Sequence, residues 1–282
     1  MSESRLPSAS IENEFLRLEY LITTGPRIIG LYPMGVDGNL LAETPDIHWP
    51  VPHGEFYLRG GHRLWKAPED SFYNCPEDGV TVIEGNGVTL RSPVDPSGLE
   101  KEIAVRLDGH RVHLSQKITW HGDKPITLAP WGITQLRLGG MGILPLSSKD
   151  GLAPNRNLVL WPYTSLKDDR LELHDDFILL HGTASEQAAK IGNCNTHGWI
   201  AYAMGNALFV KRFGVEEGAL PDLNTNVQAY VRDVCIELET LGALKTLRNG
   251  ESVTLNETWE VTVGEFPANL ETARIIGDLL NK

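Results

Sequence analysis

Two glutamates, Glu237 and Glu239, are the residues of this sequence best suited to acid–base chemistry. They lie in a stretch that alternates as a β-strand does, so they share one face while Ile236 and Leu238 share the other. Two residues along a strand correspond to about 7 Å. Carboxylates opposite an apolar face lie either on a solvated outer surface, as charges usually do, or on the floor of a concave site. We favour the floor.

A second stretch, Gly60–Glu69, brings a histidine, an arginine and a tryptophan within four residues. If the stretch is extended, Arg63 and Trp65 lie on one side and His62 lies on the other. The guanidinium group supplies several hydrogen-bond donors and the indole a flat apolar face. Arg63 and Trp65 are therefore a candidate sugar-binding pair. The alternative is a core tryptophan beside an arginine that pairs with a nearby carboxylate.

Lys190 and Trp131 are further candidates for the same site. Lys190 is long enough to pair with Glu237 or Glu239, which would lower the pKa of that carboxyl group and weaken it as a base. It would also suit a substrate with a carboxylate or phosphate group, and the alternative is a solvated lysine. Trp131 could form a stacking wall, although a buried tryptophan is more often a core residue.

The bulk composition excludes several kinds of partner. The net charge of −12 argues against nucleic acid and anionic membranes, because both need a basic surface. The segment Met1–Ser10 has no apolar core typical of a signal peptide, and no stretch is long enough to cross a membrane, so we expect a cytoplasmic protein. The three cysteines lack zinc-like spacing, and no phosphate-binding glycine loop occurs. We therefore expect no metal and no cofactor.

The turn signals predict an all-β protein. Asn86-Gly87 and Asp108-Gly109 separate alternating stretches as hairpin turns do. More than a dozen short strands without an internal linker favour one large antiparallel two-sheet β-sandwich. Helical spacing of apolar residues predicts one helix, over Asn269–Asn281. We expect a disordered N-terminus over residues 1–10 and a single domain over residues 11–282.

Three local expectations accompany this fold. The proline-rich stretch Pro45–Gly54 is predicted as a loop. The stretch Val227–Leu241 is predicted as one long strand, and Ala184–Ala189 as a short helical turn.

Several motifs together resemble the galactose mutarotase-like (aldose 1-epimerase-like) supersandwich, and within it uncharacterised bacterial proteins. The resemblance covers nearly the whole chain and implies the supersandwich fold. The motifs are Gly25-Pro26-Arg27-Ile28-Ile29, the stretch Gly60–Glu69, Ala129-Pro130-Trp131, Lys190-Ile191-Gly192, Glu237–Gly242, Asn249-Gly250-Glu251-Ser252 and Glu257-Thr258-Trp259.

The resemblance also implies residue roles. In aldose 1-epimerases a late glutamate takes the proton of the anomeric hydroxyl group and a histidine protonates the ring oxygen. By position, the base would be Glu239 or Glu237 and the sugar-binding arginine would be Arg63. The segment that matches the family's catalytic histidine, Ala129–Thr134, contains no histidine. Either His62 supplies the acid, or the protein does not catalyse the reaction in the standard way.

Three functions follow as hypotheses. The favoured one is an isomerase of the aldose 1-epimerase kind that acts on a monosaccharide by carboxylate acid–base chemistry. The second is a non-catalytic carbohydrate-binding or sensing protein, which the missing histidine favours. The third is a lyase or hydrolase acting on uronic-acid sugars, in which Lys190 and Arg63 would neutralise a carboxylate.

Overall fold

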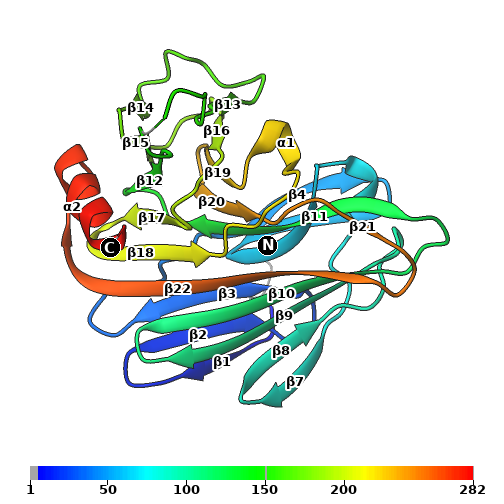
Figure 1. Ribbon diagram of the computed structural model, residues 1–282. Helices are drawn as coiled ribbons and strands as arrows, with labels where there is room; N and C mark the ends of the chain where they lie inside the picture. Colours follow the sequence, from blue (N-terminus) through cyan, green and yellow to red (C-terminus); the bar gives the residue numbers. More distant parts are fainter. Residues whose placement is uncertain (1–5, 150, 282) are drawn as a thin grey trace.

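Two antiparallel sheets, each of ten strands, form the body of the protein (Figure 1). The computed structural model describes residues 6–149 and 151–281. The first sheet runs in the order β1 (Ser8–Glu12), β2 (Leu16–Leu21), β3 (Ile28–Pro33), β6 (His62–Ala67), β11 (Ile126–Leu136), β20 (Ile236–Leu241), β19 (Val227–Val231), β16 (Ala189–Asn193) and β13 (Val159–Leu160), with β21 (Lys245–Leu247) paired to β11.

The second sheet contains the long hairpins of the middle and the end of the chain. Its order is β14 (Leu171–Leu173), β15 (Phe177–His181), β12 (Met141–Pro145), β17 (Trp199–Ala203), β18 (Gly205–Phe213), β22 (Ser252–Phe266), β10 (Arg111–Trp120), β9 (Leu99–Asp108), β8 (Gly87–Arg91) and β7 (Thr81–Gly85). A separate pair is formed by β4 (Glu43–Val51) and β5 (Gly54–Gly60), and the short helical segments are η1 (Ser71–Tyr73) and α1 (Pro221–Asn224).

The main core lies between the two sheets. Alternate residues of each strand point inward, so Leu64 and Leu238 of the first sheet and Phe209 and Trp259 of the second belong to one cluster of buried side chains. The same alternation directs the intervening residues outward. The outer face of each sheet is therefore the place for a helix, a hairpin or a site.

Each outer face carries its own apolar cover. Helix α2 (Leu270–Leu280) packs Ala273 and Ile276 onto the second sheet, beside β17 and β18 (Figure 1). The side chain of Asn269 caps this helix by accepting a hydrogen bond of 2.9 Å from the Thr272 amide. On the first sheet, the β4–β5 hairpin packs Phe56 against the outward-facing tryptophans. That hairpin forms one wall of the cavity described below.

A buried ion pair joins the two sheets beneath this cavity. Lys211 of β18 lies 3.3 Å from the carboxylate of Glu257 on β22, and neither side chain is exposed. The ammonium group also donates to the backbone carbonyls of Gly132 (3.1 Å) and Leu238 (3.2 Å) in the first sheet. In return, Thr240 of the first sheet donates to Glu257. These contacts tie β11 and β20 to the second sheet at a fixed register.

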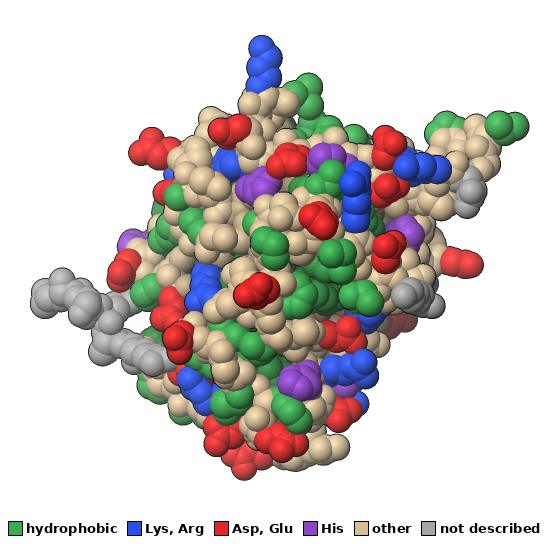
Figure 2. All heavy atoms as spheres, turned by 90° about the vertical axis from the view of Figure 1, so that its left-hand side faces the viewer, with side chains coloured by type: hydrophobic (Ala, Val, Ile, Leu, Met, Phe, Trp, Pro, Cys, Tyr) green, Lys and Arg blue, Asp and Glu red, His purple; other side chains and the backbone are tan. Residues whose placement is uncertain are grey.

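One face of the molecule is mixed in charge. Figure 2 shows acidic and basic side chains interspersed on one face of the molecule, with apolar atoms between them. Among residues 6–149 and 151–281, no helix has the length and apolar character that a membrane crossing requires.

The predicted fold class is confirmed: the protein is an antiparallel two-sheet β-sandwich with one substantial helix near its C-terminus. The hairpins predicted at Asn86-Gly87 and Asp108-Gly109 are also present. Disorder was expected over residues 1–10, of which residues 1–5 lie outside the described part of the chain. Where the chain is described, Ser8–Glu12 form strand β1, because they pair with Arg17–Leu21.

Three local predictions are wrong. The stretch Pro45–Gly54 is mostly strand, because Trp49 and Pro50 pair with β5 at the edge of a two-stranded sheet, where a proline is tolerated. The stretch Val227–Leu241 is two strands, since the chain reverses where the Arg232 amide donates to the Cys235 carbonyl at 3.2 Å. The residues 184–188 form no helical turn, and Ala189 begins strand β16.

We expect removal of Lys211 alone to destabilise the protein strongly. Replacing Lys211 by Met leaves the Glu257 carboxylate buried without its counter-charge, which typically costs about 3–5 kcal/mol of unfolding free energy. Lys117→Met removes a partly exposed lysine, 2.8 Å from Glu102, and should cost about 1 kcal/mol or less. Urea unfolding of both variants checks the prediction, and equal losses would contradict it.

Candidate active site

A cavity of about 360 Å³ lies on the outer face of the first sheet. The cross-strand register determines which side chains lie next to one another on its floor. Gln135 of β11 and Tyr230 of β19 both lie opposite Glu237 of β20, and Lys190 of β16 lies opposite Tyr230. One row of four polar side chains therefore crosses four neighbouring strands.

Two further rows complete the floor. In the second, Arg63 of β6 lies opposite Ile133, and both line the cavity, while Glu239, opposite Ile133 on β20, lies behind it. In the third, Trp65 lies opposite Trp131. The two indole rings meet edge to face, with centroids 5.8 Å apart. The polar side chains of the first row and the Trp65–Trp131 pair thus lie next to each other on one face of the sheet.

Of the two glutamates singled out in the sequence, Glu237 is the one that lines the cavity, as Glu69 and Asp233 also do. Its Oε1 accepts a hydrogen bond of 2.7 Å from Nε2 of Gln135 and lies 3.4 Å from Nη2 of Arg63. The guanidinium carbon of Arg63 lies 4.5 Å from the centroid of the Trp65 ring. Gln135 and Arg63 therefore fix one oxygen of Glu237 and leave Oε2 for other contacts.

Glu239 lies behind the cavity wall and is fully buried. Its Oε2 accepts hydrogen bonds from Nζ of Lys190 at 2.8 Å and from Nε1 of Trp131 at 2.7 Å. Burial raises the pKa of Glu239 to about 7, although the neighbouring Lys190 opposes the shift. The two glutamates share a strand face, but their environments differ sharply.

Two tyrosines also line the cavity, Tyr163 and Tyr230, with ring centroids 6.4 Å apart. Burial, with a smaller contribution from Glu237, raises the pKa of Tyr230 to about 12. Burial likewise raises the pKa of Tyr163 above its usual range. Both phenols therefore stay protonated near neutral pH and can donate hydrogen bonds.

His62 does not share this cavity. It points from β6 into the space between the sheets, where its Nδ1 lies 2.9 Å from Oγ1 of Thr134 and its Nε2 lies 2.8 Å from Oε1 of Gln116. Burial lowers the pKa of His62 to about 3, so the ring is neutral. The expected acid is thus separated from the cavity by the sheet itself. As placed, His62 cannot reach a ligand bound beside Glu237.

The structure otherwise brings together the residues singled out in the sequence. Glu237, Arg63, Trp65, Trp131 and Lys190 line one cavity, and Glu239 supports two of them. Sequence reasoning missed Gln135, Tyr163, Tyr230 and Trp49. Strand alternation could have identified Gln135, because it lies two residues beyond Ile133 on the same face. Its pairing with Glu237 depends on which strands are neighbours, and a single sequence does not show that.

No group of three or more histidine, cysteine or acidic side chains suited to a metal ion occurs in the described part of the chain.

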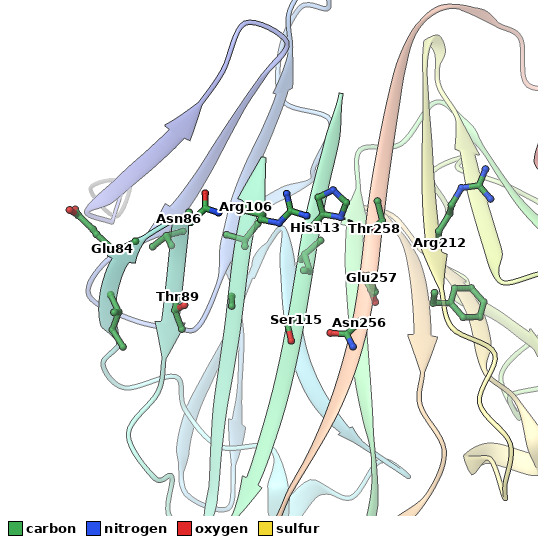
Figure 3. Close-up of a pocket in the computed structure, with 18 of the residues that line it drawn as sticks. Glu84, Asn86, Thr89, Arg106, His113, Ser115, Arg212, Asn256, Glu257 and Thr258 are labelled. Atoms are coloured by element: carbon green, nitrogen blue, oxygen red, sulfur yellow. Dashed lines mark hydrogen bonds between the residues drawn. The ribbon is translucent and has the colours of Figure 1, made fainter. Parts of the chain in front are cut away.

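A larger cavity, of about 680 Å³, lies on the outer face of the second sheet and is drawn in Figure 3. There Arg106, His113, Thr258 and Arg212 stand in a row across four strands. Arg212 is paired with Glu260 at 2.9 Å, and none of the residues predicted for the site lies there.

Comparison with known proteins gives structural neighbours only. No family model matches the sequence, and no curated protein matches it. Among solved structures, the Slr1438 protein from Synechocystis sp. PCC 6803 superimposes with a TM-score of 0.59 at 12% identity, over 94% of this chain and 98% of that chain. A candidate aldose 1-epimerase from Escherichia coli K12 gives 0.59 at 10% identity, over 92% and 99%.

A galactose mutarotase-like protein from Lactobacillus casei ATCC 334 superimposes with a TM-score of 0.55 at 10% identity, over 91% of this chain and 100% of that chain. At such identities the likeness concerns the fold. The chain therefore has the galactose mutarotase-like supersandwich fold, as the sequence motifs predicted.

The buried His62 should make the protein sensitive to acid. Its folded pKa of about 3 lies below the ordinary value of about 6.5, so between these pH values the unfolded chain binds a proton that the folded protein does not. Stability is therefore lost as the pH falls, by about 1.4 kcal/mol per unit for this group. His62→Gln should lose about 1.6 kcal/mol less than the natural protein between pH 6.5 and 5.0.

Urea unfolding at the two pH values measures this difference. His121→Gln, at an exposed histidine, is the matched control and should behave as the natural protein does. An acid sensitivity that His62→Gln leaves unchanged would mean that His62 is not held neutral in the core.

Proposed function

We propose that the protein binds a monosaccharide in the cavity on the first sheet and interconverts its anomers, as an isomerase of the aldose 1-epimerase kind. The observation that carries this proposal is the placing of Glu237. It is a carboxylate held by Gln135 and Arg63 beside the indole rings of Trp65 and Trp131. The mutarotase-like fold adds support.

The chemistry of the walls suits a sugar. A pyranose has an apolar C–H face, which packs on an indole ring, and hydroxyl groups, which both donate and accept hydrogen bonds. Among the described residues, Nε and Nη1 of Arg63 and Oε1 of Gln135 have no hydrogen-bond partner. Buried polar groups usually have partners. Sugar hydroxyl groups could supply these only if the two side chains turn toward the cavity, because the three atoms are shielded from solvent as placed.

In this proposal Glu237 is the base. It lines the cavity and has Oε2 available, whereas Glu239 is enclosed by Lys190 and Trp131. Glu237 takes the proton of the anomeric hydroxyl group, and the electron pair of that oxygen forms the carbonyl group as the bond from the anomeric carbon to the ring oxygen breaks. The ring oxygen takes a proton from one of the two phenols that line the cavity, Tyr163 or Tyr230. After rotation of the open-chain carbonyl group, that hydroxyl group attacks the other carbonyl face and returns its proton to the phenolate, while Glu237 returns its proton to the carbonyl oxygen, which gives the second anomer.

A second candidate function is sugar binding without catalysis. None of the described residues that line the cavity is a histidine, and the two tyrosines are weak proton donors because burial raises their pKa values. The cavity would then recognise a sugar through the same contacts. Calorimetric binding of a sugar that shows no accelerated exchange would favour this function over the isomerase.

The isomerase proposal is tested by exchange NMR spectroscopy of anomers with D-galactose, D-glucose and D-glucuronate. We expect the natural protein to accelerate interconversion of at least one sugar. Glu237→Gln should lower the rate at least about 100-fold, because general-base catalysis contributes that much or more. Glu186→Gln, at an exposed glutamate outside the cavity, is the control and should keep the full rate.

Two results would contradict the proposal. One is a natural protein that neither binds nor interconverts any of the three sugars. The other is a Glu237→Gln variant as fast as the natural protein, since the carboxylate would then take no part in the proton transfer.

A further inference from the structure

One oxygen of Glu239 accepts hydrogen bonds from side chains on two other strands. Its Oε2 accepts from Lys190 on β16 at 2.8 Å and from Trp131 on β11 at 2.7 Å. The ammonium group of Lys190 lies between two indole rings, 4.7 Å from the centroid of Trp131 and 4.6 Å from that of Trp161. We call Glu239, Lys190, Trp131 and Trp161 the ammonium clamp.

The clamp forms part of the cavity wall. Lys190 and Trp131 both line the cavity, while Glu239 is fully buried and does not. Lys190 is itself only 5% exposed, so its charge is compensated by Glu239 and the indole faces rather than by water. The shape of this wall therefore depends on a carboxylate that a ligand does not touch.

The groups facing Glu239 come from every side. Lys190 approaches from β16, Glu237 lies two residues away on the same strand, and Tyr163 approaches from the loop before β14. From the second sheet, the positive charge of Lys211 acts across β20. The neutral Gln228 lies opposite Glu239 on β19. Among residues 6–149 and 151–281, Lys190 is the one cation that donates a hydrogen bond to this carboxylate.

We propose that Glu239 is a positioning residue, whose negative charge holds Lys190 between the two indole rings, and that the cavity binds its sugar only when the clamp is formed. The inference rests on the proposed function for the ligand. The clamp itself is a property of the free protein and can be tested without a ligand.

Loss of the negative charge releases the clamp. A protonated Glu239 no longer compensates the ammonium group, and a buried ammonium group without a counter-charge is costly. Lys190 then leaves the space between the indole rings for water. The wall of the cavity loses its order, so the ligand binds to a smaller fraction of the molecules. Glu237, in contrast, keeps its contacts with Gln135 and Arg63.

Intrinsic tryptophan fluorescence of the free protein, titrated from pH 5.5 to 8.5, tests the clamp. Burial holds the pKa of Glu239 near 7, so we expect one transition near that pH in the natural protein. Glu239→Gln should show no such transition, whereas Glu186→Gln, at an exposed carboxylate, should keep it. A transition that persists in Glu239→Gln, or none in the natural protein, overturns the inference.

A second variant keeps the test decisive if Glu239→Gln does not fold. Lys190 lowers the pKa of Glu239, so Lys190→Met should move the carboxyl group's titration to higher pH and remove the ammonium group's effect on the indole rings. In Lys190→Met we therefore expect no fluorescence transition near pH 7, where the natural protein has one. A Lys190→Met variant with an unchanged transition overturns the inference.

The ligand arm measures the affinity for D-galactose by calorimetry at pH 6 and pH 8. If only the ionised form of Glu239 binds, the affinity should be about tenfold weaker at pH 6, because about one molecule in eleven is then ionised. Glu239→Asp, which keeps the charge, should restore a pH dependence that Glu239→Gln lacks. Equal affinity at the two pH values in the natural protein overturns the inference and leaves the proposed function intact.

The failure of the proposed function looks different. A natural protein with the transition near pH 7 but no affinity for any of the three sugars would reject the sugar site, while the clamp would stand.

Discussion

The ammonium group of Lys211 fixes the register on which the cavity depends. It donates to the carbonyls of Gly132 on β11 and Leu238 on β20, and it is held by Glu257 from the second sheet. A slip of one residue in either strand would turn every side chain of that strand to the opposite face. Glu237 would then enter the core and Leu238 the cavity. The glycine at position 132 is part of this arrangement, since a Cβ atom there would lie 2.5 Å from Oε1 of Glu257.

With the register fixed, the cavity becomes a set of cross-strand rows. The row Gln135, Glu237, Tyr230 and Lys190 supplies polar groups, and the pair Trp65 and Trp131 supplies the aromatic plate. Arg63 and Lys190 each lie against an indole ring and near a glutamate. These contacts compensate the positive charges where little water is present. Rigid strands rather than loops hold these groups, so the floor is ordered before any ligand arrives.

Strand alternation in the sequence was enough to predict which residues share a face. It placed Arg63 and Trp65 on the side opposite His62, and Glu237 with Glu239, as the structure has them. It could not choose between the two glutamates, because the enclosure of Glu239 comes from Lys190, 49 residues away along the chain, and from Trp131, 108 residues away. The chain reversal at Arg232–Cys235 was missed because residues on both sides of it have strand-like patterns. The role of Gln135 depends on its cross-strand pairing with Glu237, which a single sequence does not contain.

The central claim is that a sugar binds on the outer face of the first sheet, with Glu237 at its reacting end. A crystal structure of the protein soaked with D-galactose tests this most directly. The account predicts a pyranose ring packed on Trp65 or Trp131, with a hydroxyl oxygen about 2.6–3.2 Å from Oε2 of Glu237. A sugar found instead in the larger cavity of the second sheet, or one whose hydroxyl groups make no contact with Glu237, would contradict it.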